Sequence, residues 1–399
     1  MIAGAPPAGP TAQESAAPEP AAPWSRKVLA PRERLLYLDN LRTSLTGLVI
    51  CHHSAIALGG PGSWYWVLPP PPGSPAPAVL TLFAAVNQSF FMSLFFAISG
   101  YVTPASYDAK GPGDFLGDRL ARLGIPLLVY FFVLNPLLVY LVVWLQGRAP
   151  DGLLASLQRY YPTIVGTGPL WFVFALLVFA FVYAGLRVAA GRTRERTGTR
   201  PFPASNQILC FVVAIGLVAF VVRLFFPTGW EILGLQLGYF PLYIAFFTFG
   251  VWAHGNGWLD RLDRAQARRW GRGAWLASVT FAAAVALGGG PDLVNGGVHL
   301  PALAYALWEP WLCVAISMSL LVWYRDRFAT QGSLARRMSR SAYTAYIIHP
   351  FVVVCGTALV ARIPLPPLLR FLILCALAVP ATFALSDVIR RAPGLARIL

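Results

Sequence analysis

Charged residues are scarce in this chain of 399 residues: only 12% are Asp, Glu, Lys or Arg, while 57% are hydrophobic. Soluble globular domains carry about 25% charged residues, so the composition excludes an ordinary soluble protein. Acidic residues are the scarcest charged type, with 16 Asp and Glu against 31 Lys and Arg, and the formal net charge is +15. The composition therefore indicates an integral membrane protein with an excess of positive charge.

Motifs of several other protein classes are missing from the sequence. No zinc-finger, helix-turn-helix or RNA-binding signature accompanies the basic residues, so the positive charge does not predict a nucleic-acid partner. The sequence has no Gly-rich nucleotide loop and no C-x-x-C pair, and we predict neither a tightly bound cofactor nor a metal site. All the cysteines lie inside apolar runs, where they are expected to be small buried residues: Cys51, Cys210, Cys313, Cys355 and Cys375.

The first 30 residues are rich in Ala and Pro and cannot build a hydrophobic core. We therefore predict that residues 1–30 form a disordered tail. No basic segment precedes an apolar run there, so a signal peptide is not expected. Residues 31–399 are predicted to form one transmembrane domain.

Ten apolar runs are long enough to cross about 30 Å of hydrocarbon as helices. They are Leu36–Leu58, Pro77–Thr103, Leu123–Gln146, Pro169–Ala190, Gln207–Phe226, Ile232–Ala253, Ala274–Gly289, Leu300–Tyr324, Ala342–Ala361 and Pro364–Ile389. The sequence therefore predicts an all-α, polytopic membrane protein with about ten transmembrane helices.

Most Lys and Arg residues fall in the two terminal flanks and in every second connection between these runs. The remaining connections contain only Arg148, Arg159, Arg362 and Arg370. Basic residues in short loops are retained in the cytoplasm, so both termini are predicted to be cytoplasmic, which agrees with an even number of helices. This topology explains the net charge without an acidic partner.

The first apolar run contains polar residues that are costly to bury, in the segment LRTSLTGLVICHHSA. Arg42 and His53 are eleven residues apart, which places them within about 20° of each other on a helix and about 16 Å apart along its axis. Asp39 precedes Arg42 by three residues, close enough for an ion pair, and His52 points about 100° away from His53. Histidine exchanges protons near neutral pH, so this polar face predicts a site. Two simpler interpretations are that Arg42 only anchors the helix at the interface and that the histidines hydrogen-bond neighbouring helices.

The second run ends in FFAISGY, in which Ser99 and Gly100 permit close backbone approach. In the loop expected after it, Arg119 and Arg122 are three residues apart and would share one helical face. Two guanidinium groups on one cytoplasmic face can hold phosphates, although the pair can also serve only as positive charge that sets the topology.

Other polar or aromatic residues in the apolar part of the chain have two interpretations each. Glu309 is expected either to orient a histidine or to pair with Arg223. Asn87, beside Gln88, is expected to hydrogen-bond into the site predicted on the first helix or to hold helices together. Trp64 and Trp66 in the first outer loop can stack on a sugar ring or belong to an interfacial aromatic belt.

Five segments, taken together and in this order, resemble the bacterial acyltransferase-3 family of integral membrane O-acyltransferases. They are R-x10-H at Arg42 and His53, FFAISGY, R-x-x-R at Arg119 and Arg122, GPLWFVFALL at Gly168–Leu177 and SAYTAYIIHPF at Ser341–Phe351. The resemblance extends from about Tyr37 into the last helix. The start of the domain is similar to a stand-alone branch that includes the osmoregulated periplasmic glucan succinyltransferases.

The resemblance implies an enzyme of the bacterial inner membrane. Its expected partners are acyl-CoA as donor substrate, an extracytoplasmic glycan or lipid-linked hydroxyl as acceptor, and membrane lipid. His53 is implied as the catalytic residue, with His52 and Glu309 as further catalytic candidates. The expected donor-binding residues are Arg42, Arg119, Arg122, Ser99, Gly100 and Tyr101. Asp39, Asn87 and His349 are expected in support, and Trp64, Trp66 and Trp171 at the acceptor.

Two functions of other classes also fit the polar face of the first helix. In a secondary transporter or exporter, the Arg and His residues would form a proton relay, and no thioester donor would be needed. A membrane sensor or scaffold would carry a partner-binding soluble module, which the sequence does not predict. The O-acyltransferase therefore remains the main prediction, with the transporter as its alternative.

Overall fold

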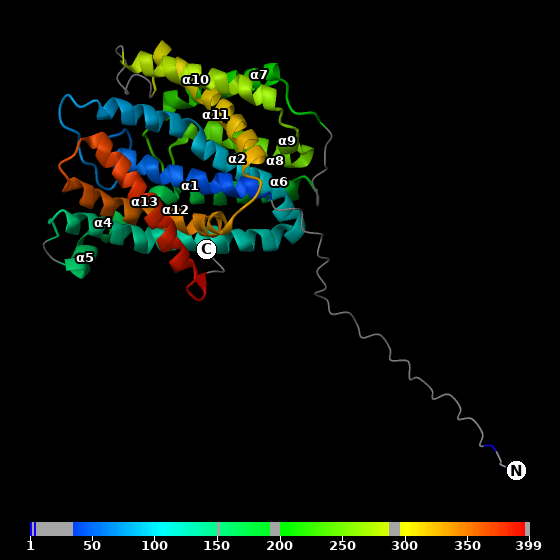
Figure 1. Cartoon of the computed structure of the whole chain (residues 1–399), viewed down its shortest axis with the longest axis horizontal. Coiled ribbons are helices and arrows are strands. Elements are labelled where there is room, and N and C mark those ends of the chain that lie inside the picture. The colour runs from blue at the N-terminus through cyan, green and yellow to red at the C-terminus, as the bar shows by residue number, and fades with distance from the viewer. Residues whose placement is uncertain (2–3, 5–34, 150–151, 192–199, 287–295, 396–399) are drawn as a thin grey trace. The chain divides into compact units, whose positions relative to one another are not determined.

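The computed structural model describes residues 1, 4, 35–149, 152–191, 200–286 and 296–395 of the chain (Figure 1). Its contacts divide the chain into Met1–Leu35 and Leu36–Leu399, and the second unit is described below. Apart from Met1 and Gly4, the predicted tail lies outside the described residues, as does the predicted end of the seventh helix at Gly289.

The described part of Leu36–Leu399 is all-α, as predicted, apart from one isolated β-bridge between Ile232 and Leu235. Its α-helices are α1 Leu36–Ala57, α2 Ala76–Arg119, α3 Ile125–Val129, α4 Asn135–Leu145, α5 Gly152–Ile164, α6 Trp171–Ala189, α7 Ser205–Phe225, α8 Phe240–Asn256, α9 Trp258–Arg261, α10 Arg264–Ala286, α11 Leu300–Arg327, α12 Ser333–Ala361 and α13 Pro367–Arg390. Two π-helical turns, η1 Leu120–Gly124 and η2 Tyr130–Leu134, and two 3-10 turns, η3 Gly168–Leu170 and η4 Leu237–Tyr239, complete it.

Six stretches of the described residues are long and apolar enough to cross a membrane. They are Ala76–Leu145, Gly152–Ala189, Ser205–Phe225, Leu300–Arg327, Ser333–Ala361 and Pro367–Arg390. The first stretch contains two of the predicted transmembrane helices, joined without a loop. The chain is therefore a polytopic membrane protein.

Helix α1 is enclosed by other helices of the bundle. It packs against α2, α11, α12 and α13, and Figure 1 shows it between α2 and the pair α12 and α13. α2 also packs along α8, and α7 along α11. Five polar residues of α1 are consequently buried within the bundle: Asp39, Thr43, Thr46, His52 and Ser54.

The loop predicted after the second transmembrane helix is helical instead. α2 continues to Arg119 and leads through η1 into α3, with one break at Gly111, where φ is 76°. Glycine adopts this left-handed conformation without steric cost, and Pro112 can begin the next helical turn because it needs no hydrogen-bond acceptor for its nitrogen. The GPG segment therefore kinks the helix and does not end it.

The sixth predicted helix begins eight residues later than expected, at Phe240 rather than Ile232. Ile232 and Leu235 exchange two backbone hydrogen bonds of 3.0 and 2.9 Å, and Leu233 between them has φ of 53°. Pro241 then lies in the first turn of α8, where proline is favoured. Residues 226–239 thus form an irregular connection, which contributes to the site described below.

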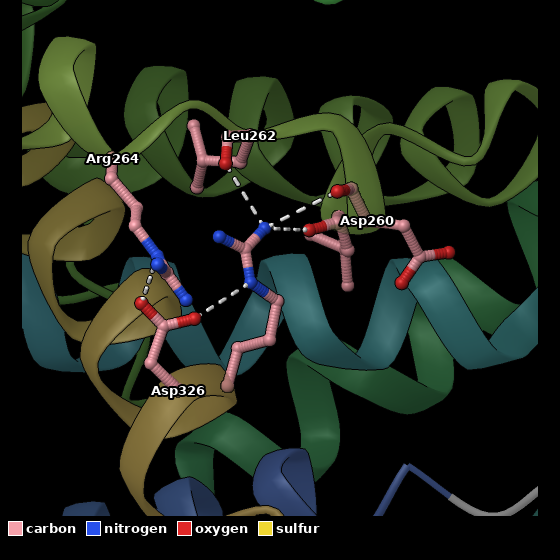
Figure 2. A network of polar contacts seen from close by, with 6 residues as sticks. Asp260, Leu262, Arg264 and Asp326 are labelled. Carbon is pink, nitrogen blue, oxygen red and sulfur yellow. Dashed lines mark hydrogen bonds and ion pairs between the residues drawn. The ribbon is translucent and has the colours of Figure 1, made fainter.

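An arginine near the end of α11 holds the connection between α9 and α10. Arg325 Nη1 donates to the carbonyl oxygens of Asp260 and Leu262 at 3.4 and 3.0 Å. Asp326 forms ion pairs with both Arg325 and Arg264, at 3.4 and 2.7 Å (Figure 2). The guanidinium group therefore supplies a donor to the carbonyls at the end of a short helix, which have no helical partner.

Candidate functional site

A cavity of about 770 Å³ is lined by residues of α1, α2, α4, α6, α8, α10 and α11 and of the connections between helices. Its aromatic lining consists of Trp64, Tyr65, Trp171, Tyr239, Tyr243, Phe281 and Tyr305. Its main polar residues are His52, His53, Gln88, Asn135, Glu231 and Gln236. Among the described residues, no Lys or Arg lines the cavity and Glu231 is its one acidic side chain, so the lining does not favour an anion. Its aromatic rings suit a molecule with flat apolar faces and hydroxyl groups.

His53 of α1 meets His349 of α12 at this cavity. His53 Nδ1 and His349 Nε2 are 2.8 Å apart, and His349 Nδ1 lies 2.7 Å from the carbonyl oxygen of Tyr346. His53 lines the cavity and is partly exposed, while His349 is fully buried behind it. The two residues are 296 positions apart in the chain.

The helix that carries His349 begins earlier than predicted. The sequence predicted a helix over Ala342–Ala361, but α12 starts nine residues earlier, at Ser333. The segment before Ala342 is rich in arginine, so its hydropathy did not indicate that the helix begins there. His349 therefore lies near the middle of α12.

The ring of Trp64 covers His53. The two ring centroids are 4.2 Å apart with an angle of 14° between the planes. Trp171, also predicted to bind the acceptor, lines the cavity and stacks on Tyr243 at 5.7 Å. Trp66 is not among the lining residues and packs against a separate cluster that includes Leu138. Two of the three predicted acceptor tryptophans thus share the cavity with His53.

His52 lines the same cavity but has different neighbours. Its ring lies 5.0 Å from that of Phe91 and meets the His53 ring edge-on at 5.7 Å. It is 7% exposed, and its Nδ1 has no hydrogen-bond partner among the described residues. The angular separation predicted from helix geometry therefore places only His53 against His349.

A polar network on the cavity wall was not predicted. The Tyr65 hydroxyl lies 3.1 Å from that of Tyr130 and donates to Asn135, whose amide nitrogen donates to the Ile164 carbonyl at 2.7 Å. A side chain at Gly168 would clash with the Tyr65 hydroxyl. The signal in the sequence was Asn135 itself, a lone amide within the apolar segment FFVLNPLLV.

The structure separates the two neighbouring amides of α2. Gln88 lines the cavity and donates to the Tyr243 hydroxyl at 3.1 Å. Asn87, the predicted supporting residue, is buried outside the lining, and its Nδ2 has no hydrogen-bond partner among the described residues. Successive residues of a helix point about 100° apart, so only one of them can face the cavity.

Glu309 forms an ion pair with Arg223, and no histidine of the described residues is bonded to it. Both side chains are almost fully buried, with exposed fractions of 1% and 3%. Arg223 also donates to the Gly238 carbonyl at 3.1 Å and lies 5.2 Å from the ring centres of Tyr239 and Tyr305. Of the two interpretations of Glu309, the ion pair is the one observed, and its partner supports two tyrosines of the cavity wall.

Arg42 lies on the same unbroken helix as His53 but outside the cavity. Its guanidinium group pairs with Asp39 at 3.3 Å, as the three-residue spacing predicted, and its side chain is 45% exposed. The eleven residues between Arg42 and His53 correspond to about 16 Å along α1. An exposed cationic group and a cavity histidine thus occupy different levels of one helix.

Arg119 and Arg122 are joined by a π-helical turn and not by the regular α-helix that the shared face assumed. The π-helical turn η1 begins immediately after Arg119 and changes the angle between the two side chains. Arg119 lies over the Phe115 ring at 5.0 Å, and Arg122 pairs with Asp118 at 3.1 Å. Neither arginine lines the cavity.

The FFAISGY segment joins two helices closely. A Cβ atom on Gly100 would come within 2.1 Å of the Phe247 carbonyl oxygen of α8, and Gly250 of α8 faces α2 with the same restriction. Ser99, Gly100 and Tyr101 do not line the cavity. The small residues therefore allow α2 and α8 to cross, which explains their pattern without a ligand.

Comparison with known proteins agrees with these features. Residues 35–387 match the model of the acyltransferase-3 family, described as "Acyltransferase domain". The curated relatives include Glucans biosynthesis protein C of Salmonella schwarzengrund (strain CVM19633), 27% identical over 237 residues, and its counterpart of Salmonella typhi, 26% identical over the same length. Each match covers 57% of this chain and 59% of the relative, so the chain spans less than two thirds of either relative. No solved structure matches the chain significantly.

Proposed function

We propose that this chain is a membrane O-acyltransferase, since it belongs to the acyltransferase-3 family. In this proposal it moves an acyl group from acyl-CoA to a hydroxyl group of an extracytoplasmic glycan or related cell-envelope acceptor. The proposal rests on the surroundings of His53, which is partly exposed in an aromatic cavity. His53 is hydrogen-bonded to a buried histidine, and the ring of Trp64 stacks on it. This arrangement offers a neutral base beside a surface on which a sugar ring can stack.

With the topology predicted from the basic residues, the cavity would lie on the extracytoplasmic side of the membrane, where the acceptor is expected. We propose ten transmembrane helices in the inner membrane of a bacterium, with both termini in the cytoplasm. The connections that line the cavity, around Trp64, Gly168 and Glu231, are then extracytoplasmic. A membrane-impermeant thiol reagent applied to intact cells should label Pro72→Cys above the parent protein's background and leave Ala329→Cys unlabelled. The opposite pattern would reverse the topology.

The donor is proposed to approach from the other end of α1. Arg42, Arg119 and Arg122 would hold the phosphates of acyl-CoA, because planar guanidinium groups bind phosphate bidentately. None of the three lines the cavity, so only the flexible thioester arm would reach His53. Among the described residues no Lys or Arg lines the cavity, which is consistent with phosphate binding at a different place from acyl transfer.

In the proposed reaction, His53 first accepts one proton from the acceptor and then donates it to CoA. As the acceptor oxygen attacks the thioester carbon, its proton moves to His53 and the oxygen–carbon bond forms. The carbon–sulfur bond then breaks, and the thiolate of CoA accepts this proton from His53. General base catalysis of this kind contributes about 10²–10⁴-fold to a rate.

Substitution of His53 tests the proposal. His53→Asn should abolish acylation of cell-envelope glycans, measured by mass spectrometry of cells that express the variant in place of the parent protein. His299→Asn is the matched control, because His299 caps α11 outside the cavity and asparagine is also a good cap. Parental acylation in the His53 variant would refute the role of His53. If glycans from cells lacking the protein carried every acyl group found in the parent, the acyltransferase proposal itself would fall, and the transporter would become the better candidate.

A further inference from the structure

A chain of two hydrogen bonds links the cavity to the backbone of α12. It runs from His53 through His349 to the carbonyl oxygen of Tyr346, with distances of 2.8 and 2.7 Å. The rings of the two histidines are nearly parallel, with an angle of 12° between their planes. His349 has no exposed surface, so its contacts with His53 and Tyr346 determine which of its nitrogens carries a proton.

The backbone carbonyl sets the direction of this chain. A carbonyl oxygen only accepts hydrogen bonds, so the proton of neutral His349 must be on Nδ1. Its Nε2 is then an acceptor, and His53 must donate to it from Nδ1. The lone pair of neutral His53 is consequently on Nε2. Among the two nitrogens of His53, this is the one left to accept a proton from a molecule in the cavity.

The residue after His349 explains why the Tyr346 carbonyl is available. In a regular α-helix this carbonyl would accept the backbone N–H of the residue four positions later. That residue is Pro350, which has no N–H. His349 Nδ1 takes the place of the missing donor, so the local sequence Tyr-x-x-His-Pro both frees an acceptor and supplies a side chain to use it.

We propose that His349 is a positioning residue for acyl transfer: it holds His53 in the tautomer with a basic Nε2 and accepts a hydrogen bond from the imidazolium that forms. This inference rests on the proposed function. When the proton of the acceptor hydroxyl moves to His53 Nε2, the Nδ1 proton stays on His53 and points at His349 Nε2. No proton leaves the pair, and CoA later receives the one that His53 gained.

A neutral histidine in this position has a physical advantage over a carboxylate. An ionised carboxylate would be costly in a fully buried site between two helices. The imidazole of His349 accepts the same hydrogen bond without a permanent charge. Trp64 covers the exposed side of His53, which limits the access of water that could compete for Nδ1.

Three substitutions of His349 test the proposal by steady-state kinetics of the purified protein in lipid vesicles, with acyl-CoA and a glycan acceptor. His349→Gln places an amide oxygen near the position of Nε2, His349→Asn reaches only the position of Nδ1, and His349→Phe keeps the ring without an acceptor. We expect the Phe and Asn variants to lose about 10²–10⁴-fold in kcat, the range of general base catalysis, and Gln to recover at least tenfold over Phe. KM for either substrate should change little, because His349 contacts neither.

The outcomes separate this proposal from the proposed function. If His53→Asn is inactive but His349→Phe has the parental kcat, the positioning role is wrong and the acyltransferase proposal stands. Equal losses in the Gln and Phe variants would also overturn the role, since a merely structural histidine gives that result. Thermal unfolding of each variant identifies those that do not fold. If the Phe variant does not fold, the Gln and Asn variants, which both keep a polar amide in place of the ring, decide the comparison.

Pro350→Ala provides an independent test that changes no cavity side chain. It restores a backbone N–H that competes with His349 for the Tyr346 carbonyl, while removal of proline from a helix interior favours the helix. We expect a several-fold lower kcat with unchanged KM and equal or higher thermal stability. An unchanged kcat would contradict the role of the carbonyl in orienting His349.

Discussion

Two arginines in different parts of the bundle contact the same types of side chain. Each guanidinium group lies over two tyrosine rings and pairs with one carboxylate. The groups are Arg223 with Tyr239, Tyr305 and Glu309, and Arg187 with Tyr107, Tyr183 and Asp108. They differ in burial: the exposed fractions are 3% and 1% for the Arg223 pair but 8% and 21% for the Arg187 pair.

The two clusters support different parts of the molecule. Tyr239 and Tyr305 line the cavity, so the Arg223 cluster holds the wall of the proposed acceptor site. In the other cluster, Tyr107 contacts the Phe115 ring at 5.5 Å, and Arg119 lies over that ring. The Arg187 cluster therefore supports the segment that carries one of the proposed donor-binding arginines.

Burial makes the same ion pair more sensitive to substitution in one place than in the other. A sealed carboxylate that loses its partner cannot be hydrated, whereas a partly exposed one can. The comparison predicts a graded series of effects for the arginines of this chain.

The largest effect is expected for Arg223→Met. It leaves Glu309 buried without its partner and should lower the free energy of unfolding by about 3–5 kcal/mol, measured by denaturant titration in detergent micelles. The double variant Arg223→Met/Glu309→Leu removes both charges and should recover most of the loss. Without such recovery, the damage would come from the cavity wall and not from the unpaired carboxylate.

Arg187→Met should have a smaller effect, about 1.5–3 kcal/mol in the same titration, because Asp108 retains access to water. It should also raise KM for acyl-CoA more than KM for the acceptor, since the cluster supports Arg119. A loss equal to that of Arg223→Met would show that exposure does not govern the difference between the clusters.

Arg42→Lys tests the proposed donor end of α1 without removing charge. The ammonium group cannot hold a phosphate bidentately, so KM for acyl-CoA should rise several-fold, up to about tenfold, which corresponds to about 1.4 kcal/mol. Arg391→Lys is the matched control, an exposed arginine that also pairs with an aspartate. If both variants titrate like the parent protein, Arg42 is only an anchor at the interface.

The smallest effect is expected for Arg264→Met. Its guanidinium group is 65% exposed and pairs with Asp326 in the network of Figure 2. Exposed ion pairs contribute about 0–1 kcal/mol. The free energy of unfolding should therefore fall by less in this variant than in Arg223→Met or Arg187→Met. A larger loss would mean that the α9–α10 connection depends on this pair as well as on Arg325.

Predictions based on local sequence succeeded where one helix contains all the information. The Asp39–Arg42 pair and the different directions of His52 and His53 follow from helix geometry alone. Predictions based on apolar runs failed where a helix continues through polar or Gly- and Pro-containing sequence, as in α2 beyond Tyr107 and at the start of α12. Packing of neighbouring helices stabilises these segments, which composition alone does not reveal.

Composition and spacing were enough to specify a helical membrane protein, the polar face of α1 and the family to which its motifs are similar, because hydrophobic length and helical periodicity are properties of contiguous residues. The partner of each polar residue depended on the tertiary structure. His53 meets a residue 296 positions away and Glu309 meets one 86 positions away. Such pairs form where packed helices bring their faces together, and the sequence of one helix does not specify which face its neighbour presents.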